Sequence, residues 1–290
     1  MKKISIFFLL FIPILAMAQR DWSAMKITTT EVGPGVYRLF VGESVSTVLF
    51  VGEDGVMLID AAYEQTAPQL KAAIEAITSH PVKYLVNTHH HGDHVGGNYN
   101  MGKDATIIAH HFVKDFVSRE HRAGERITPA LPREAQPDIS FSDEINFDFN
   151  GQTLQMKHLP KGHTGGDIII YFPESKVLKM GDLLFADNFP FVDVNNGGDP
   201  LGYIKNQQYI LENYPEDLTI VGGHGPIYTM EQLREYNRTL VQTMEVVRKA
   251  KEAGMTAEQM KANRILKEWE EWGKFFITED RWIDTLFPVF

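Results

Sequence analysis

Residues 89–94 read His-His-His-Gly-Asp-His and directly follow the apolar run Tyr84-Leu85-Val86. Five of these six residues carry an imidazole or a carboxylate, which are ligands that zinc prefers in catalytic sites. Burying so many polar groups without partners would be costly. A strand end carries such a cluster well, because the backbone there is rigid and the loop after it can turn several side chains toward one point. The stretch therefore predicts a metal site on the end of a β-strand.

Three later motifs carry further side chains of the same kind. They are Gly162-His163-Thr164-Gly165-Gly166-Asp167, Met180-Gly181-Asp182 and Gly222-Gly223-His224-Gly225-Pro226. Each follows or adjoins an apolar run of β type or a glycine turn, so we expect each near a strand end. The candidate metal ligands that they add are His163, Asp182 and His224.

In this order, the four motifs resemble those of the metallo-β-lactamase superfamily of hydrolases. The resemblance runs from about Val36 to Pro226 and is specific, because four motifs in the right order hardly arise by chance. It implies a single α/β domain of the αββα type, in which two sheets are packed between outer helices and the metals lie at one edge. Periodicity alone would indicate only an α/β fold.

The resemblance also implies a role for each candidate residue. One metal would be held by His89, His91 and His163. The second would be held by Asp93, His94 and His224. In the branch that includes glyoxalase II and the lactonases, an Asp after a Gly bridges both metals, and Asp182 stands at that step here. Asp60, which closes the run Val56-Met57-Leu58-Ile59, would support the metal loop from outside the ligand set.

The resemblance thus implies a hydrolase with two Zn²⁺ ions per chain and a small-molecule substrate. A metal-bound hydroxide would attack an ester, thioester or lactone carbonyl, since metal coordination brings the pKa of water from 15.7 toward roughly 7. Asp93 would act in catalysis by orienting the hydroxide as well as by binding metal. No Ser or Cys nucleophile stands in a suitable motif.

Other functions stay open at this point. A β-lactamase that opens β-lactam rings fits the fold, although such enzymes generally lack the bridging Asp. Lactonases of this kind often place a Tyr shortly after that Asp, whereas Leu183-Leu184-Phe185 follow here. A mono-iron persulfide dioxygenase shares the His-rich motif, and a non-catalytic metal-binding module is the alternative that is not an enzyme.

The remaining histidines are expected to have ordinary structural roles. His90 has neighbours on both sides that should face the metals, so we expect it to face away, at the surface or behind the ligands. His110 and His111 are expected to pack or to start a helix, and His80, His121 and His158 lie outside the motifs. Two loops, at residues 128–137 and 187–200, are expected to wall the cleft, since loops on a rigid scaffold usually select the substrate.

The N-terminal residues have the pattern of a secretory signal peptide. Lys2-Lys3 precede an apolar run from Ile4 to Leu15, and Ala16-Met17-Ala18 offers small residues at a cleavage site. We expect a signal peptide at residues 1–18 and a periplasmic or secreted hydrolase domain at residues 19–290. The run is short for a bilayer span, so no stable membrane insertion is expected after cleavage. A chain without cysteine suits an oxidising compartment.

The charge and the C-terminal residues limit the partners. A formal net charge of −10 and the lack of a Lys/Arg run make nucleic acid a poor partner. Beyond the core at about residues 36–226, residues 227–290 are expected to be helical and then aromatic. The stripe of Leu233, Tyr236, Leu240 and Met244 has helical spacing. The aromatic residues after it favour core packing, with a homodimer contact or a lid over the site as alternatives.

Overall fold

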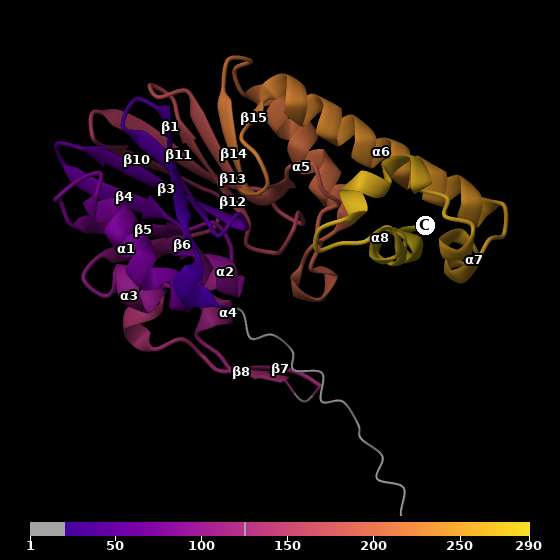
Figure 1. Ribbon diagram of the computed structural model, residues 1–290, viewed down its shortest axis with the longest axis horizontal. Helices are drawn as coiled ribbons and strands as arrows, with labels where there is room; N and C mark the ends of the chain where they lie inside the picture. The colour runs from indigo at the N-terminus through magenta and orange to yellow at the C-terminus, as the bar shows by residue number, and fades with distance from the viewer. Residues whose placement is uncertain (1–20, 125) are drawn as a thin grey trace, which may run out of the picture.

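The structure is a computed structural model, and it describes residues 21–124 and 126–290. The expected signal peptide at residues 1–18 lies outside the described residues. Two β-sheets lie face to face, and helices cover their outer surfaces (Figure 1). The chain therefore has the expected αββα architecture, as one domain with C-terminal helices.

The first sheet comes from the N-terminal half of the chain. Its strand order is β1 (Ile27–Gly33), β2 (Val36–Val41), β3 (Val45–Gly52), β4 (Gly55–Ile59), β5 (Val82–Asn87), β6 (Thr106–His110) and β9 (Ile139–Phe141). Neighbours from β1 to β4 are antiparallel, whereas β4, β5, β6 and β9 run parallel to one another. The carboxyl ends of the parallel strands therefore meet at one edge.

The second sheet comes from the middle of the chain. Its strand order is β10 (Glu144–Phe149), β11 (Gln152–His158), β12 (Ile168–Phe172), β13 (Val177–Phe185), β14 (Thr219–His224) and β15 (Tyr228–Thr229). Only β13 and β14 pair in parallel among the described strands of this sheet. A small antiparallel pair, β7 (His121–Ala123) and β8 (Arg126–Thr128), projects away from both sheets (Figure 1).

Helices complete the two outer layers. The α-helices are α1 (Ala67–Glu75), α2 (Gly92–Val95), α3 (Asn98–Gly102), α4 (His111–Val117), α5 (Pro200–Asn213), α6 (Met230–Glu252), α7 (Ala257–Ala262) and α8 (Glu279–Leu286). Short 3-10 helices are η1 (Trp22–Ala24), η2 (Glu64–Thr66), η3 (Arg133–Ala135), η4 (Val194–Asn196), η5 (Lys267–Gly273) and η6 (Phe287–Val289). No helix in the described ranges is long and apolar enough to cross a membrane.

The strands β3, β4 and β6 of the first sheet are buried on both faces, which explains their nearly continuous apolar sequences. In β4, Met57 and Ile59 face the second sheet, where they pack with Val177 and Val221. Leu58, which alternates with them, packs outward with α1. Because successive residues of a strand point to opposite faces, one strand contributes to both cores.

The run Tyr84-Leu85-Val86 lies in the expected strand, β5, and the stripe of Leu233, Tyr236, Leu240 and Met244 lies on the expected helix, α6. The strand β1 was not predicted, because its polar residues are mostly exposed and show no apolar alternation. The strand β13 continues past Met180 to Phe185, so Asp182 lies within a strand. The aromatic tail divides into two parts: Trp282 is fully buried, whereas Phe275 and Phe276 are about half exposed.

Candidate metal centre

The His-rich stretch lies where the sequence placed it, at the carboxyl end of β5. After Thr88 the chain passes through His89 and His90, and α2 begins directly after His91. This single helical turn carries Asp93 and His94 at successive positions. A strand end followed at once by a helical turn presents these side chains over a short length of backbone, as the motif predicted.

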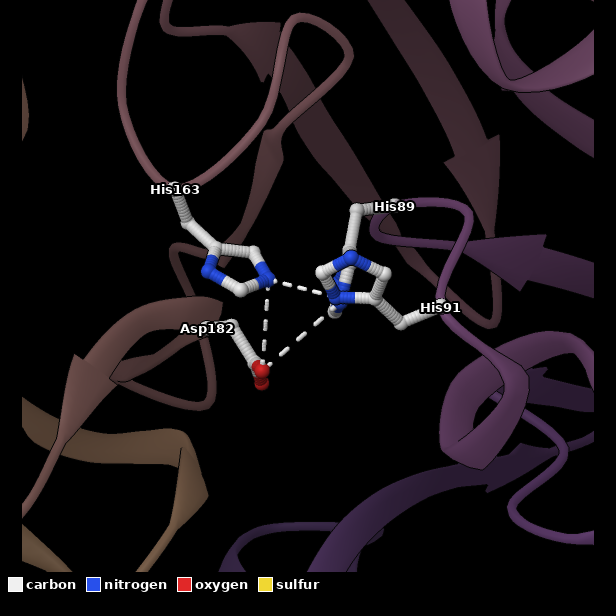
Figure 2. A group of neighbouring side chains, drawn as sticks. All are labelled: His89, His91, His163 and Asp182. Carbon is white, nitrogen blue, oxygen red and sulfur yellow. Dashed lines mark hydrogen bonds and ion pairs between the residues drawn. The ribbon is translucent and has the colours of Figure 1, made fainter. Parts of the chain in front are cut away.

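The candidate ligands gather in two groups. The structure brings together His89, His91, His163 and Asp182 in one group and Asp93, His94 and His224 in the other. In each group, the potential ligand atoms all lie within 4.8 Å of one another. Figure 2 shows the first group, in which His163 of the β11–β12 loop and Asp182 of β13 point toward His89 and His91 of the loop after β5.

Asp182 lies between the two groups. Its Oδ1 atom is 3.0 Å from His94 Nε2, and its Oδ2 atom is 3.2 Å from His224 Nε2. Oδ2 also lies 3.4 Å from His163 Nε2 and 3.7 Å from His89 Nε2. One carboxylate therefore reaches histidines of both groups, as a bridging ligand must.

Backbone carbonyls hold two of the candidate histidines through Nδ1, the ring nitrogen that would not bind metal. His163 Nδ1 is 2.7 Å from the Phe191 carbonyl, and His224 Nδ1 is 2.8 Å from the Ser44 carbonyl. A carbonyl only accepts hydrogen bonds, so Nδ1 of both rings carries the proton and Nε2 presents its lone pair. Fixing the ring and its tautomer in this way is what prepares a histidine to bind metal.

Two of the histidines contact carboxylates from behind. His94 Nδ1 lies 2.9 Å from Asp60 Oδ2, and the Asp60 carboxylate also accepts hydrogen bonds from the backbone and hydroxyl of Thr88. The structure thus places Asp60 behind the ligands, at the position that the resemblance implied. His91 Nε2 lies 3.0 Å from Asp193 Oδ2, while its Nδ1 lies 2.8 Å from His163 Nε2.

Several buried polar atoms at the centre have no hydrogen-bond partner among the described residues. They are His89 Nε2, His94 Nε2 and Asp182 Oδ1. Although His94 Nε2 and Asp182 Oδ1 are close, their geometry is not that of a hydrogen bond. Leaving such atoms unsatisfied costs about 1–3 kcal/mol each. Nitrogen lone pairs and carboxylate oxygens aimed at one point fit divalent cations, and zinc in particular.

The charges within the centre depend on one another. Burial would raise the pKa of Asp182, yet the surrounding histidines lower it well below its usual value. Burial would lower the pKa of His94, but Asp182, Asp60 and Asp93 raise it well above its usual value. For His163 burial prevails and lowers the pKa to about 3. A carboxylate kept ionised next to a neutral imidazole is a ready metal-binding pair.

Two glycines make room for Asp182. Gly181 has a φ of +53°, and a Cβ there would lie 2.8 Å from Thr88. A Cβ on Gly223 would lie only 1.8 Å from Asp182 Oδ1. The strand pair β13–β14 shifts register at Gly181, which aims Asp182 at the centre. The glycines of the Gly-Asp and Gly-Gly-His motifs are therefore steric requirements of the site.

The turn that presents His163 is closed by its own motif. The buried Asp167 carboxylate accepts hydrogen bonds from the backbone N–H of Thr164 at 2.8 Å and from its hydroxyl at 2.5 Å. Burial raises the pKa of Asp167 to about 8, although the Thr164 bonds oppose that shift. Asp167 therefore shapes the loop and does not reach the centre as a candidate ligand.

His90 was expected at the surface or behind the ligands, and the structure excludes the surface. It is only 3% exposed, and its ring lies 3.8 Å from that of Phe116. Neither ring nitrogen has a hydrogen-bond partner in the described chain, and burial lowers its pKa to about 2. His90, His91 and Asp193 do form a third compact group, but Asp193 is already hydrogen-bonded to His91. The packing of α4 over the loop buries His90, and its sequence neighbours did not indicate this.

The two expected cleft loops differ in their placement. Residues 187–200 do reach the site: Phe191 lines the cavity, and Asp193 contacts His91. Residues 128–137 do not line that cavity, so the prediction of a wall there was wrong. Their Leu131 packs beside α4, and the Ala135 carbonyl accepts a hydrogen bond from Asn98. Asp193 itself was not predicted as a site residue. The only sequence signal for it was its place in the loop at residues 187–200, which was expected to wall the cleft.

A cavity of about 650 Å³ opens on the candidate ligands. At its base lie His91, Asp93, Asp182 and His224. Its walls are aromatic: Tyr63, Phe185, Phe191, Phe275 and Phe276. This volume falls in the range of small-molecule sites.

The fold and the ligand geometry agree with the comparison to known protein families. The family model described as the metallo-beta-lactamase superfamily matches residues 41–224, which include all of the candidate ligands. The chain belongs to this superfamily.

Individual relatives are more distant. The chain is 23% identical to a metallo-beta-lactamase type 2 of Bacteroides fragilis over 83% of this chain and 96% of that protein. It is 31% identical to a hydroxyacylglutathione hydrolase of a Synechococcus species, over 52% of each chain. A solved structure of a metallo-beta-lactamase from Pontibacter korlensis matches with a TM-score of 0.60 and 22% identity, over 74% of this chain and 99% of that one. That structural likeness supports the fold alone.

Proposed function

We propose that the protein is an exported hydrolase that binds two zinc ions and cleaves the ester, thioester or lactone bond of a small molecule. The observation that carries this proposal is the convergence of seven ligand-type side chains, with Asp182 in reach of both groups. The unpartnered buried atoms at the same point support a resident cation pair. Similarity to a hydroxyacylglutathione hydrolase supports acyl hydrolysis, although it spans only about half of that protein.

The residues present fit zinc by donor type and by tautomer. His89, His91 and His163 would hold one ion, Asp93, His94 and His224 the other, and Asp182 would touch both. When bound, such ions supply Lewis acidity and make water available as a nucleophile near neutral pH. Asp93 is the one carboxylate of the set with a partly exposed side chain, at 22%. Its Oδ2 atom, 3.4 Å from His224 Nε2, is placed to hold and orient a water molecule beside the substrate.

The alternative is a β-lactamase. It is supported by the relative from Bacteroides fragilis, which matches over nearly its whole length. Asp182 favours esters and lactones instead, because the branch that this chain resembles uses that carboxylate. A β-lactam ring is itself an amide that the same chemistry could open, so substrate tests must separate the two.

One experiment tests the proposal. The purified protein is assayed on a panel of aryl esters, lactones, glutathione thioesters and β-lactams, with and without a chelator, and its metals are measured by elemental analysis. We expect chelator-sensitive hydrolysis of at least one ester, thioester or lactone, and loss of most of it in Asp93→Ala. Turnover of β-lactams alone would establish the alternative, and iron in place of zinc would oppose the whole proposal.

Export is a separate part of the proposal. It is supported by the pattern of residues 1–18, which predicts cleavage after Ala18 and a mature chain that begins at Gln19. Mass spectrometry of protein from the native host tests it. A mature terminus at Met1 would contradict the periplasmic or secreted location.

A further inference from the structure

Aromatic rings form the walls of the cavity over the candidate metal centre. Phe275 and Phe276, between η5 and α8, are 47% and 50% exposed. Phe276 meets Phe191 edge-on at 5.6 Å, and Phe275 lies 6.0 Å from the His224 ring. Half-exposed rings beside a polar centre offer apolar area for part of a ligand.

The charged groups at the same cavity are acidic. Glu43, Asp93 and Asp182 line it, and no Lys or Arg does so in residues 21–124 and 126–290. Asp93 and Asp182 belong to the candidate ligand set, so bound cations would offset their charges. Glu43 lies outside that set and is exposed at the cavity. Its negative charge therefore faces the solvent route by which a substrate arrives.

The position of Glu43 is fixed by its neighbours. Gly42 and Glu43 have φ values of 59° and 53°, in the left-handed region that a residue with a Cβ rarely adopts. The next residue, Ser44, accepts a hydrogen bond from His224 Nδ1 through its carbonyl, and its hydroxyl lies 3.2 Å from the Tyr63 hydroxyl. The loop that anchors a candidate metal ligand thus also holds a carboxylate at the cavity.

Nearby basic groups are directed elsewhere. Arg38 donates to the Gly225 carbonyl and to Ser46 Oγ. Lys179 is fully buried and donates to backbone carbonyls of β3 and β14. Arg281 donates to the Phe276 carbonyl at 2.8 Å, with its guanidinium 4.6 Å from that ring, and it lines a separate neighbouring cavity. A carboxylate on a substrate would meet none of them in the cavity over the metal centre.

We infer that this cavity selects an uncharged acyl substrate with an aryl or alkyl group and rejects one that carries a carboxylate on that group, away from the scissile bond. The inference rests on the proposed hydrolase function and narrows its substrate class. Water oxygen would bond to the acyl carbon as the acyl–oxygen bond breaks, and the products would be an alcohol, a carboxylate and a proton. A carboxylate held among the aromatic walls would lose water, would meet no Lys or Arg side chain there and would face Glu43, which is unfavourable on each count.

The test uses two esters of the same size. One is 4-acetoxybenzamide, and the other is 4-acetoxybenzoate, which differs by carrying a negative charge. We expect kcat/KM to be at least about 10-fold lower for the benzoate, because juxtaposed like charges cost several kcal/mol. Glu43→Gln should bring the kcat/KM values of the two esters closer together. Glu43→Lys should make them equal or should favour the benzoate. Equal rates for the two esters with the unaltered protein would overturn the inference.

The matched control is Glu53→Lys. Glu53 is also exposed and lies just beyond the far end of β3, so the change in net charge is the same but its position is remote. This control should leave the ester ratio unchanged. An equal effect of both lysine variants would show that net charge, and not Glu43 at the cavity, sets the preference, which would also overturn the inference.

A binding measurement separates the inference from the proposed function. Calorimetry with two unreactive ketones, 4-(2-oxopropyl)benzamide and 4-(2-oxopropyl)benzoate, reports affinity without turnover. We expect the amide to bind and the benzoate to bind at least about 10-fold more weakly, with Glu43→Lys reducing the difference. If neither ester is hydrolysed but the ketones show this preference, the hydrolase proposal fails while the cavity preference stands. If hydrolysis occurs but the benzoate ketone binds as well as the amide ketone, the inferred cavity preference is wrong while the hydrolase proposal stands.

Discussion

At the scale of single residues, Asp182 has the greatest effect on the centre. Its two oxygens reach His94 on one side and His163 on the other, and the surrounding histidines keep its pKa well below the usual value. Gly181 and Gly223 are glycines because a Cβ at either position would collide with Thr88 or with Asp182 itself. The backbone of two strands is thus arranged around one carboxylate.

Asp182→Asn should weaken the binding of both metal ions while leaving the fold intact. An amide lacks the charge that offsets the repulsion between two cations. Removing a residue that only hydrogen-bonds to a metal ligand typically lowers metal affinity about 10–100-fold. Removing the charge of a ligand itself should therefore lower metal affinity on the order of 100-fold or more. Metal content after dialysis against a graded chelator series measures this, with the exposed Asp104→Asn as control. Full metal content and full activity in Asp182→Asn would show that it is not the bridge.

Asp193→Ala should weaken metal binding about 10–100-fold through His91, whose Nε2 atom it holds at 3.0 Å. Asn196 also donates to the Asp193 carboxylate, at 2.8 Å. Asn196→Ala is therefore the matched control, because it removes this bond and keeps the contact with His91. Zinc affinity from a competition titration is the measurement. Similar losses in the two variants would mean that Asp193 only supports its own loop.

The candidate ligands could be predicted from the sequence because each stands in a motif whose glycines and strand-end position are local. Asp193 could not, since no local pattern marks the loop carboxylate that will face His91. The sequence left open whether His90 lies at the surface or is buried, for a related reason. Its burial depends on the packing of Phe112 and Phe116 of α4, which are more than twenty residues further along the chain.

At the scale of elements, the C-terminal segment combines core packing with a wall of the cavity. The buried Trp282 in α8 stacks on Phe189 at 5.9 Å and donates to Thr243 Oγ1 in α6 at 3.0 Å. Phe275 and Phe276 lie just before α8, so docking of this helix sets where they stand. The core position anchors the segment that walls the site.

Trp282→Ala should lower the free energy of unfolding by about 3–5 kcal/mol, because it empties a large fully buried volume. Urea denaturation followed by circular dichroism measures the loss. Phe290→Ala, which truncates an aromatic residue that is 37% exposed in the same tail, should cost on the order of 1 kcal/mol or less. Equal losses in both variants would contradict the assignment of Trp282 to the core.

We expect the start of α4 to be sensitive to acid, because a histidine caps it. His110 Nδ1 accepts the Phe112 N–H at the helix start, and its Nε2 donates to the Ser142 carbonyl. Burial, together with neighbouring His158 and His111, lowers the pKa of His110 from 6.5 to about 4. Between these two values the unfolded chain binds a proton that the folded chain does not. The stabilisation is therefore complete above about pH 6.5 and is lost as the pH falls toward 4.

His110→Asn should reduce this acid sensitivity, since Asn can cap the helix but does not titrate. Unfolding free energies measured at pH 7 and pH 5 should differ less for the variant than for the unaltered protein. His80→Asn, at an exposed position before β5, should keep the original pH dependence. An unchanged difference in His110→Asn would exclude His110 as the source.

Elements with a local signal were the most predictable. Asn150 and Gly151 both have positive φ, which the Asn-Gly hairpin signal requires, and Thr229 caps α6 in a reciprocal pair with Gln232. The strand β1 has no such signal, because its pairing with β2 and not its own pattern makes it a strand. The extension of β13 to Phe185 likewise depends on its parallel partner β14.

At the scale of the whole molecule, the packing of the two sheets creates the site. His89, His91, Asp93 and His94 follow a strand of the first sheet. Asp182 and His224 lie in strands of the second sheet, and His163 lies in the loop between its strands β11 and β12. Neither sheet alone carries a complete ligand group. Resemblance to a family predicted this juxtaposition, but spacing along the chain could not have done so, since the residues are brought together only by sheet packing.

The metal content of the purified protein tests the central claim most directly. Elemental analysis of protein prepared without chelator and then loaded with zinc should give close to two zinc ions per chain, one for each ligand group that Asp182 joins. One ion or fewer per chain, even after zinc loading, would contradict a two-ion centre.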